Sequence, residues 1–153
     1  MFNRFVADSR VLTARAAELA VAAGDPSVEA EHLLVALAER RGTPAGDALH
    51  EAGLDPERIR EGLEEDARAA LAAVGVEVPP GALGARSVAP SQTPWGATGT
   101  LALERSLEAA RDRRDREIRP EHVLLGILRT RVGAVPRLLE REGVDRDALA
   151  AAV

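Results

Sequence analysis

Glu31-His32-Leu33-Leu34 and Glu121-His122-Val123-Leu124 are two copies of one motif, and ninety residues separate them. The same offset relates Gly53-Leu54-Asp55 to Gly143-Val144-Asp145. Three pairs of single positions keep this register without a gap: Leu49 and Leu139, Arg41 and Arg131, and Asp25 and Asp115. A register held over so much sequence predicts one helical unit built twice. It favours a surface that binds other molecules over a catalytic centre.

Apolar residues at helical spacing, together with helix-capping residues, predict four helices in each half of the chain. We expect them at 6–23, 30–41, 44–52 and 56–73, and again at 98–114, 120–131, 134–142 and 145–152. Prolines and glycines between the halves break any helix there. The sequence therefore predicts an all-α fold of two tandem four-helix repeats, related by a pseudo-twofold axis. We expect one domain over 1–153, with repeat one at 1–73, a linker at 74–94 and repeat two at 95–153. Neither half has many large apolar residues, so the two are expected to pack on each other.

The composition excludes several kinds of active site. All twenty basic residues are arginine, so neither a G-x-x-x-x-G-K-[ST] nucleotide loop nor a Schiff-base lysine can form. The chain has no cysteine, which excludes disulfides and thiolate metal ligands. None of the five serines lies in a G-x-S-x-G turn. We therefore expect a protein that is not an enzyme, and an unrecognised hydrolase is the weaker alternative.

Charge and hydropathy narrow the class of partner. The net charge is −5, and acidic residues interrupt the arginines of segment 111–119, which argues against nucleic acid as a partner. No stretch has the length and apolar character of a signal peptide or a membrane span. We expect a cytoplasmic protein that does not enter the membrane.

The repeated Glu-His pair supports two interpretations. Glu31 and Glu121 each lie in the first turn of a predicted helix, where the helix dipole favours a carboxylate by about 0.3–1 kcal/mol. Alternatively, each glutamate accepts a guanidinium while nearby helix N–H groups bind an anion. His32 and His122 have no second histidine four residues away, so we interpret them as core or capping residues. We expect no metal and no cofactor.

The few aromatic residues gather before the predicted first helices. Phe5 and Trp95 are repeat equivalents, whereas Gln92 stands at the place equivalent to Phe2. One interpretation is a hydrophobic staple that fixes the entry of the chain onto the core. The other is a groove lined by Phe2 and Trp95. For Trp95 the sequence leaves both open.

These motifs resemble a known family. The start Met-Phe-x-x-Phe, the two E-H-[LV]-L motifs and the two G-[LV]-D turns resemble the Clp N-terminal repeat domain of Hsp100 unfoldases of the ClpC and ClpA/ClpB type. The resemblance covers about 1–73 and 93–153. It implies an α-helical module with pseudo-twofold symmetry that binds protein substrates and adaptors and passes them to an ATPase ring.

The resemblance also implies two sets of site residues. In ClpC-type members the glutamates of the two E-H motifs bind phosphoarginine, and they match Glu31 and Glu121 here. In actinobacterial relatives, cyclic-peptide antibiotics bind a groove between the first helices of the two halves. The positions that match this groove are Phe2, Arg10, Thr13, Gln92, Trp95 and Glu104.

At two places the chain departs from the family pattern, and these departures favour one of the two implied sites over the other. ClpC-type domains usually have Gly-Thr before Glu-His, whereas this chain has Glu29-Ala30 and Arg119-Pro120. The carboxylate of Glu29 would repel a phosphate by about 1 kcal/mol. The groove is therefore the leading hypothesis and the phosphoarginine reader is the alternative.

The relation of this chain to an unfoldase is the last expectation. No ATPase module follows Val153, so we expect either an excised domain or a free-standing member of the family, and the divergent motifs favour the latter. A free-standing member would act as an adaptor, a competitor or a sink for ligands of the full unfoldase. A regulator that dimerises through its helical faces is a further alternative.

Overall fold

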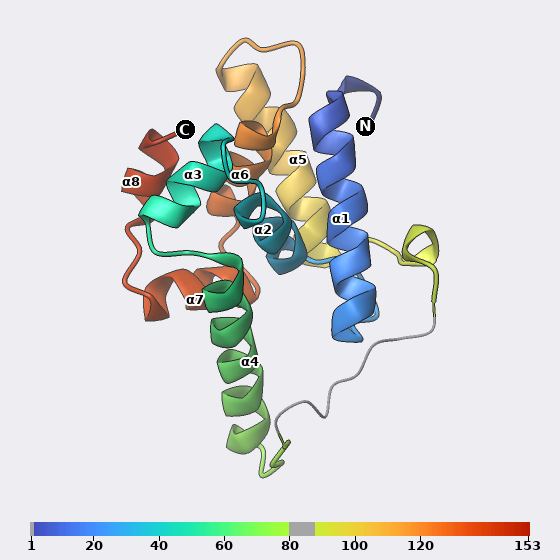
Figure 1. The fold of residues 1–153 in the computed structure, drawn as a ribbon, viewed down its shortest axis with the longest axis vertical. Helices are drawn as coiled ribbons and strands as arrows, with labels where there is room; N and C mark the ends of the chain where they lie inside the picture. The colour runs from blue at the N-terminus through green and yellow to red at the C-terminus, as the bar shows by residue number, and fades with distance from the viewer. Residues whose placement is uncertain (1, 80–87) are drawn as a thin grey trace.

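The computed structural model describes residues 2–79 and 88–153, and within them the chain forms eight α-helices and two short 3-10 helices (Figure 1). Those of the first half are η1 (Phe2–Arg4), α1 (Ala7–Ala23), α2 (Ala30–Ala38), α3 (Pro44–Glu51) and α4 (Pro56–Ala73). Those of the second half are η2 (Pro90–Gln92), α5 (Ala97–Asp112), α6 (Pro120–Arg129), α7 (Ala134–Arg141) and α8 (Arg146–Ala151). The all-α class and the repeated four-helix plan predicted from the sequence are confirmed.

The helices begin and end at residues whose chemistry favours an end. Gly24 follows α1 with φ 78°, a left-handed conformation that glycine adopts without a Cβ clash. Thr43 precedes α3, and its hydroxyl accepts a hydrogen bond from Gly46 N at 3.2 Å. Asp145 precedes α8 and accepts from two main-chain N–H groups of its first turn. The second helix stops earlier than predicted, at Ala38, because the chain turns before α3.

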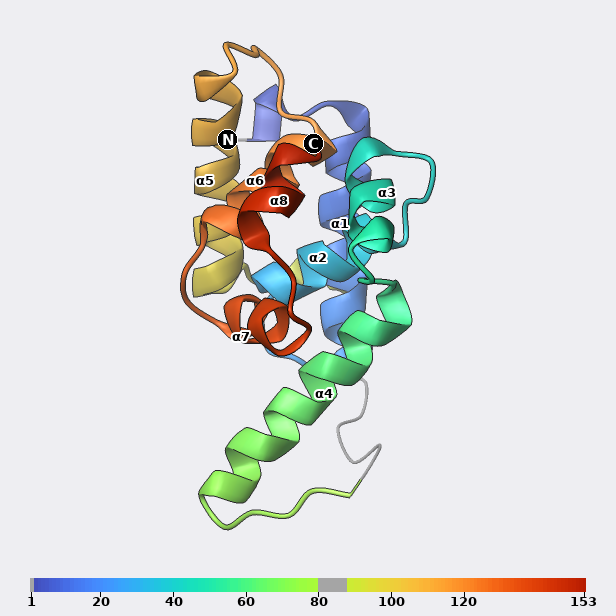
Figure 2. The same cartoon turned by 90° about the vertical axis from the view of Figure 1, so that its left-hand side faces the viewer.

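The second helix of each repeat lies at the centre of the molecule. Nearly every residue of α2 and α6 is buried, as expected for helices that are apolar on all sides. In repeat one, α1 packs on α2, and in repeat two α5 packs on α6. The helices α2 and α6 also contact each other and the first helix of the opposite repeat (Figures 1 and 2). One hydrophobic core therefore contains residues of both repeats.

The contact between α5 and α6 depends on a glycine. A Cβ added to Gly126 would lie 2.2 Å from Ala102 O and 2.6 Å from Ser106 N. These are main-chain atoms, so a side chain at this position would push the helices apart. The repeat equivalent of Gly126 is Ala36, a buried residue of α2.

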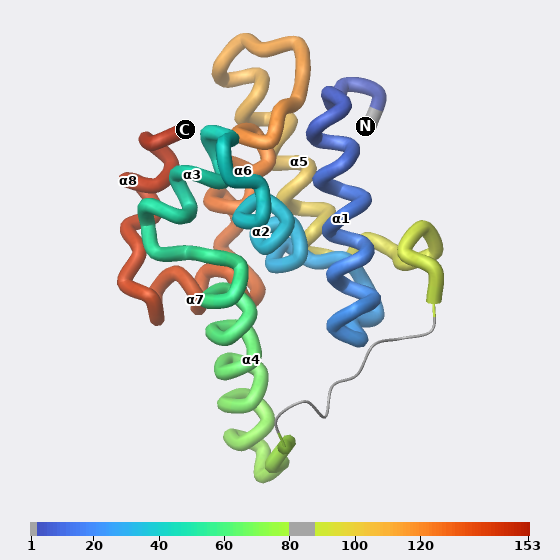
Figure 3. Tube along the Cα trace, viewed as in Figure 1, coloured from blue at the N-terminus to red at the C-terminus, as the bar shows by residue number. Residues whose placement is uncertain are grey.

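The fourth helices differ most between the repeats. The 18 residues of α4 form the part of the molecule that projects away from the other helices in Figures 2 and 3, whereas α8 has only 6 residues. Most of the outer half of α4 is exposed. Within the predicted linker, η2 packs against α1. Among the described residues, none of the helices combines the length and apolar character that crossing a lipid bilayer requires.

Candidate functional site

Two short main-chain pairings join the repeats. Phe5 pairs with Ile118, and Trp95 pairs with Val28. Four hydrogen bonds flank them: Val6 N to Ile118 O at 3.2 Å, Ile118 N to Arg4 O at 2.9 Å, Gly96 N to Val28 O at 3.0 Å, and Val28 N to Pro94 O at 2.8 Å. Each pairing is the other shifted by the repeat offset. The seam between the repeats is therefore pseudo-twofold symmetric in its hydrogen bonds.

The two aromatic residues of the seam are buried to different degrees. Phe5 is only 2% exposed, whereas Trp95 is partly exposed and packs against the edge of the core. A Cβ added to Gly99 would lie 3.0 Å from Trp95 Cε3, so the ring lies over the first turn of α5. Trp95 thus packs against the start of α5 while the residue as a whole stays partly exposed.

The other residues predicted for the groove are distributed along α1 and α5. Arg10 is exposed in the first turn of α1, and Glu104 is exposed in the middle of α5. Thr13 is buried, and its hydroxyl donates to Arg10 O at 2.9 Å. Phe2 begins η1, and its side chain lies outside the described atoms. The first helices flank the central pair α2 and α6, on which each of them packs.

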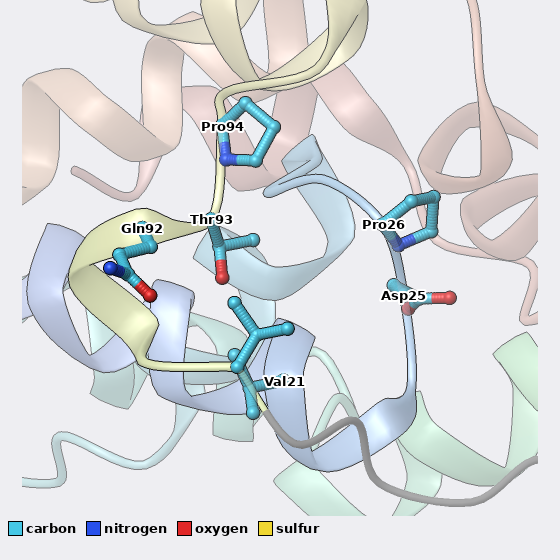
Figure 4. A pocket seen from close by; sticks show the side chains of 7 residues that line it. Val21, Asp25, Pro26, Gln92, Thr93 and Pro94 are labelled. Carbon is cyan, nitrogen blue, oxygen red and sulfur yellow. The ribbon is translucent and has the colours of Figure 1, made fainter.

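Gln92 lines a small hollow at the opposite end of α1 from Arg10. The hollow measures about 80 Å³ and lies between the segment before α5 and the end of α1 (Figure 4). Val21 and Thr93 also line it. Val21 lies eleven positions after Arg10 in α1, which is roughly 16 Å along a helix. Of the six predicted groove residues, this hollow therefore contains only Gln92, while Arg10 and Glu104 are exposed on α1 and α5 and Thr13 is buried.

The histidines of the two motifs are structural. His32 Nδ1 accepts from Glu29 N at 2.9 Å, and its Nε2 lies 2.8 Å from Asp25 Oδ2. In repeat two, His122 Nδ1 accepts from Arg119 N at 3.0 Å and its Nε2 lies 2.9 Å from Asp115. Both rings are buried, and an Nδ1 that accepts leaves Nε2–H to donate to the aspartate. In the part of the chain that the structure describes, no three metal-ligating side chains cluster.

Glu29, the residue before the first Glu-His pair, reaches across the seam. Its carboxylate accepts from Thr98 N at 3.0 Å, from Thr98 Oγ1 at 2.5 Å and from Gly99 N at 3.4 Å, so it binds the N-terminus of α5. Ser27 Oγ donates to the other oxygen at 2.7 Å. Burial acts to raise the pKa of Glu29, but these hydrogen bonds outweigh it and hold the pKa below 4.5. An anion of the chain itself therefore occupies this helix end.

Repeat two carries the opposite charge at the equivalent place. Arg119 replaces Glu29, its side chain is 58% exposed, and its nearest acidic partner is Glu117 at 3.9 Å. Asp8 stands where Thr98 stands in the other half, and it pairs with Arg40 at 3.0 Å. The residue before the second Glu-His pair is therefore an exposed cation, whereas the residue before the first is a carboxylate that caps α5.

Within residues 2–79 and 88–153, neither motif glutamate forms an ion pair with an arginine. Burial raises the pKa of Glu31 above 4.5, and the charges of Glu29 and Asp25 add to the rise. Among the described residues, Glu121 Oε2 is buried without a hydrogen-bond partner. Arg137 lies near Glu31 but is bound to Asp66, with two nitrogens 2.9–3.1 Å from its carboxylate. Glu121 thus retains acceptor capacity for a ligand donor.

Comparison with protein families now places the chain. Residues 4–85 and 98–153 match the Clp repeat (R) N-terminal domain. The chain belongs to this family. It is 28% identical to the chaperone protein ClpB of Oceanobacillus iheyensis over 146 residues, which is 95% of this chain and 16% of that protein. It is 29% identical to the negative regulator of genetic competence ClpC/MecB of Bacillus subtilis, with the same coverage. The chain therefore spans about one sixth of the length of these relatives.

Solved structures of Clp N-terminal domains have the same fold. The N-terminal domain of ClpD from Arabidopsis thaliana superposes with a TM-score of 0.74 at 21% identity, covering 99% of this chain and 93% of that one. The Hsp104 N-terminal domain of Candida albicans superposes with a TM-score of 0.66 at 14% identity, covering 97% of this chain and 87% of that one. The N-domain of ClpV from Vibrio cholerae gives 0.63 at 19% identity, covering 98% and 82%. At these identities the likeness establishes the fold, and the family resemblance inferred from the motifs is confirmed.

Sequence reasoning missed two features of the surface. It placed the charge of Glu29 beside a ligand site, whereas the side chain caps α5. The signal was present, because Gly96 and Gly99 flank Thr98 and leave room for a carboxylate: a Cβ at Gly96 would lie 1.7 Å from Glu29. The second feature is a hollow between α3 and α8, lined largely by alanine.

Proposed function

We propose that the chain is a non-enzymatic module that binds segments of protein substrates or adaptors on behalf of a Clp unfoldase. Its family membership and its likeness to the N-terminal domains of ClpD, Hsp104 and ClpV support this proposal. The chain matches 16% of the length of its ClpB and ClpC relatives, so the unfoldase that it serves is part of the proposal. A cytoplasmic location belongs to the same proposal.

The proposed binding surface follows the seam between the repeats. Trp95 carries the argument, because a partly exposed tryptophan supplies a large contact area at a small cost in entropy. Arg10 and Glu104 add exposed charges of opposite sign on the two first helices. The remaining members of the proposed surface are Phe2, Thr13 and Gln92. Such an extended surface suits a peptide, linear or cyclic, better than a small metabolite.

Titration with an actinobacterial cyclic-peptide antibiotic tests this surface, because Trp95 is the sole tryptophan and reports directly by fluorescence. We expect a saturable change in emission. Replacing Arg10 by alanine should weaken binding by about tenfold, which corresponds to 1.4 kcal/mol. The matched control is Arg68→Ala, because Arg68 is also exposed but lies on the projecting part of α4. No change in emission at high micromolar ligand, in a folded sample, would refute the groove.

A second candidate function is the reading of phosphoarginine by Glu31 and Glu121. The observation that favours it is the buried, unpartnered Oε2 of Glu121, beside the exposed cation of Arg119. A guanidinium would satisfy the glutamate while Arg119 attracts the phosphate. The carboxylate of Glu29 makes the Glu31 site the weaker of the two.

Calorimetry with free phosphoarginine distinguishes the two functions. The reader predicts heat of binding that Glu121→Gln abolishes, that Glu31→Gln reduces less, and that Arg10→Ala leaves unchanged. The groove predicts the reverse dependence for the cyclic peptide. Absence of any heat with phosphoarginine at millimolar concentration would leave the groove as the single function.

A further inference from the structure

The pseudo-twofold symmetry brings a third and a fourth helix together twice, once as α7 with α4 and once as α3 with α8. At the first junction, Leu138 lies against Gly62, where an added Cβ would be 2.4 Å from Leu138 Cδ1. Arg58 forms a two-pronged ion pair with Glu142 at 2.6 and 2.7 Å. Arg141 Nη1 donates to Gly62 O at 3.0 Å. Large side chains thus close this junction.

At the second junction alanine stands in place of Leu138, Glu142 and Arg58. The ninety-residue offset matches Ala48 to Leu138, Ala52 to Glu142, Ala148 to Arg58 and Ala152 to Gly62, and it matches Glu51 to Arg141. The result is an open hollow of about 330 Å³, which we call the α3/α8 hollow. Figures 1 and 2 show these two helices on the side of the molecule opposite α1 and η2. The hollow is therefore remote from the surface proposed above.

The chemistry of the α3/α8 hollow is apolar and acidic. Four alanines, Val144 and Leu149 supply the apolar lining, and Glu51 and Asp145 supply two carboxylates. None of its nine lining residues is basic. Asp145 accepts hydrogen bonds from Asp147 N and Ala148 N at 2.9 and 3.1 Å. Glu51 is exposed and makes no hydrogen bond or ion pair with another residue of the described ranges. Within the described ranges Glu51 is therefore the carboxylate of the hollow without a partner, whereas one oxygen of Asp145 already caps α8.

We propose that the α3/α8 hollow is a docking site for a basic, amphipathic segment of a partner protein. The segment inserts one bulky aliphatic or aromatic side chain between the alanines and places an arginine or lysine against Glu51 and Asp145. The closed junction shows how such a pair of side chains binds. There Leu138 packs against Gly62 of α4, and Arg141, one helical turn further on, donates a hydrogen bond to the same residue. A volume of about 330 Å³ is within the range of pockets that bind ligands. This site does not depend on the function proposed for the seam.

The probe for this site is a synthetic helical peptide, acetylated and amidated, with leucine and arginine three positions apart on an alanine background. We expect saturable changes in the amide NMR signals of Glu51, Gly143 and Ala148, and none at Trp95. Two control peptides replace the leucine by alanine or the arginine by glutamate, and each should lose binding. An absence of signal changes at these residues up to about 1 mM peptide would overturn the proposal.

Two variants locate the binding. Ala148 is exposed on the wall of the hollow, so Ala148→Leu fills it without disturbing the core. Glu51→Gln removes one of the two charges. Each should weaken binding by about tenfold, whereas Glu64→Gln, at an exposed acid of α4, should not. Equal effects of all three variants would overturn the proposal. Sedimentation that reveals self-association, lost in Ala148→Leu, would identify a second copy as the occupant and overturn it too.

Discussion

Glu29 and Arg119 stand at the same place in the two repeats, before Glu-His pairs whose histidines make the same hydrogen bonds. One side chain caps the first helix of the other repeat, and the other extends towards solvent. The junctions of third and fourth helices differ in the same manner, closed by Leu138 on one side and left open by Ala48 on the other. The comparison teaches that duplication kept the histidine contacts of the second helices, whereas the residues at the helix junctions changed. We therefore expect ligands to distinguish the two repeats through the residues that differ between them.

The largest effect is expected where α6 packs on α5. Gly126→Ala should lower the free energy of unfolding by about 3 kcal/mol, because the new methyl group meets main-chain atoms of α5. The reciprocal change, Ala36→Gly, should cost only about 1–2 kcal/mol, from the loss of a buried methyl and from backbone entropy. Urea unfolding of both variants measures the difference. Equal costs would mean that the two helix pairs approach equally closely.

The buried histidines should respond alike. His32→Ala and His122→Ala each remove one acceptor for a main-chain N–H and one partner of an aspartate. We expect each to lower the free energy of unfolding by about 2–3 kcal/mol. Thermal unfolding of the two variants in one buffer makes the comparison. A cost at one histidine more than twice that at the other would contradict the equivalence of the two turns.

A smaller effect is expected from the cap of α5. Hydrogen bonds hold the pKa of Glu29 below 4.5, so its charged form stabilises the fold above pH 4.5, and this stability is lost as the pH falls through the lowered pKa. Glu29→Gln should therefore cost about 1 kcal/mol at pH 7. The difference from the wild-type protein should shrink in acid. The matched control is Glu117→Gln, an exposed acid of repeat two, which should change little.

The charge of Glu31, two residues further on, should have the opposite effect on the free energy of unfolding. Burial raises its pKa above 4.5, so the charged form costs stability once the pH has risen through that raised value, and the cost is absent below pH 4.5. Glu31→Gln should raise the free energy of unfolding at pH 7 by about 0.5 kcal/mol. Denaturant titrations at pH 4 and pH 7 test this. A destabilised variant at pH 7 would show that the Glu31 carboxylate already has a strong partner in the fold.

The sequence predicted the fold well because the signals that define it are local. Helical periodicity, capping residues and the turn at Gly53 all act within a few residues, and the duplication repeats each signal. It also interpreted His32 and His122 as core or capping residues, from the absence of a ligand partner. The residues proposed for the groove and for phosphoarginine remain predictions. The role of Glu29 escaped prediction because its partner, Thr98, is 69 residues away and is brought close only by the seam.

By itself the sequence determined the class of the chain: a duplicated helical module without lysine, cysteine or a nucleophile motif. These properties follow from residue types and short spacings, and they can be recognised without knowledge of the folded structure. Only the tertiary structure decided which charges are already occupied and which surfaces are open. The main-chain pairings between the repeats place Glu29 against the N-terminus of α5. Side chains of unequal size close the junction of α4 with α7 and leave a hollow between α3 and α8. Such contacts join residues distant in the chain, and their energies depend on the space between packed helices.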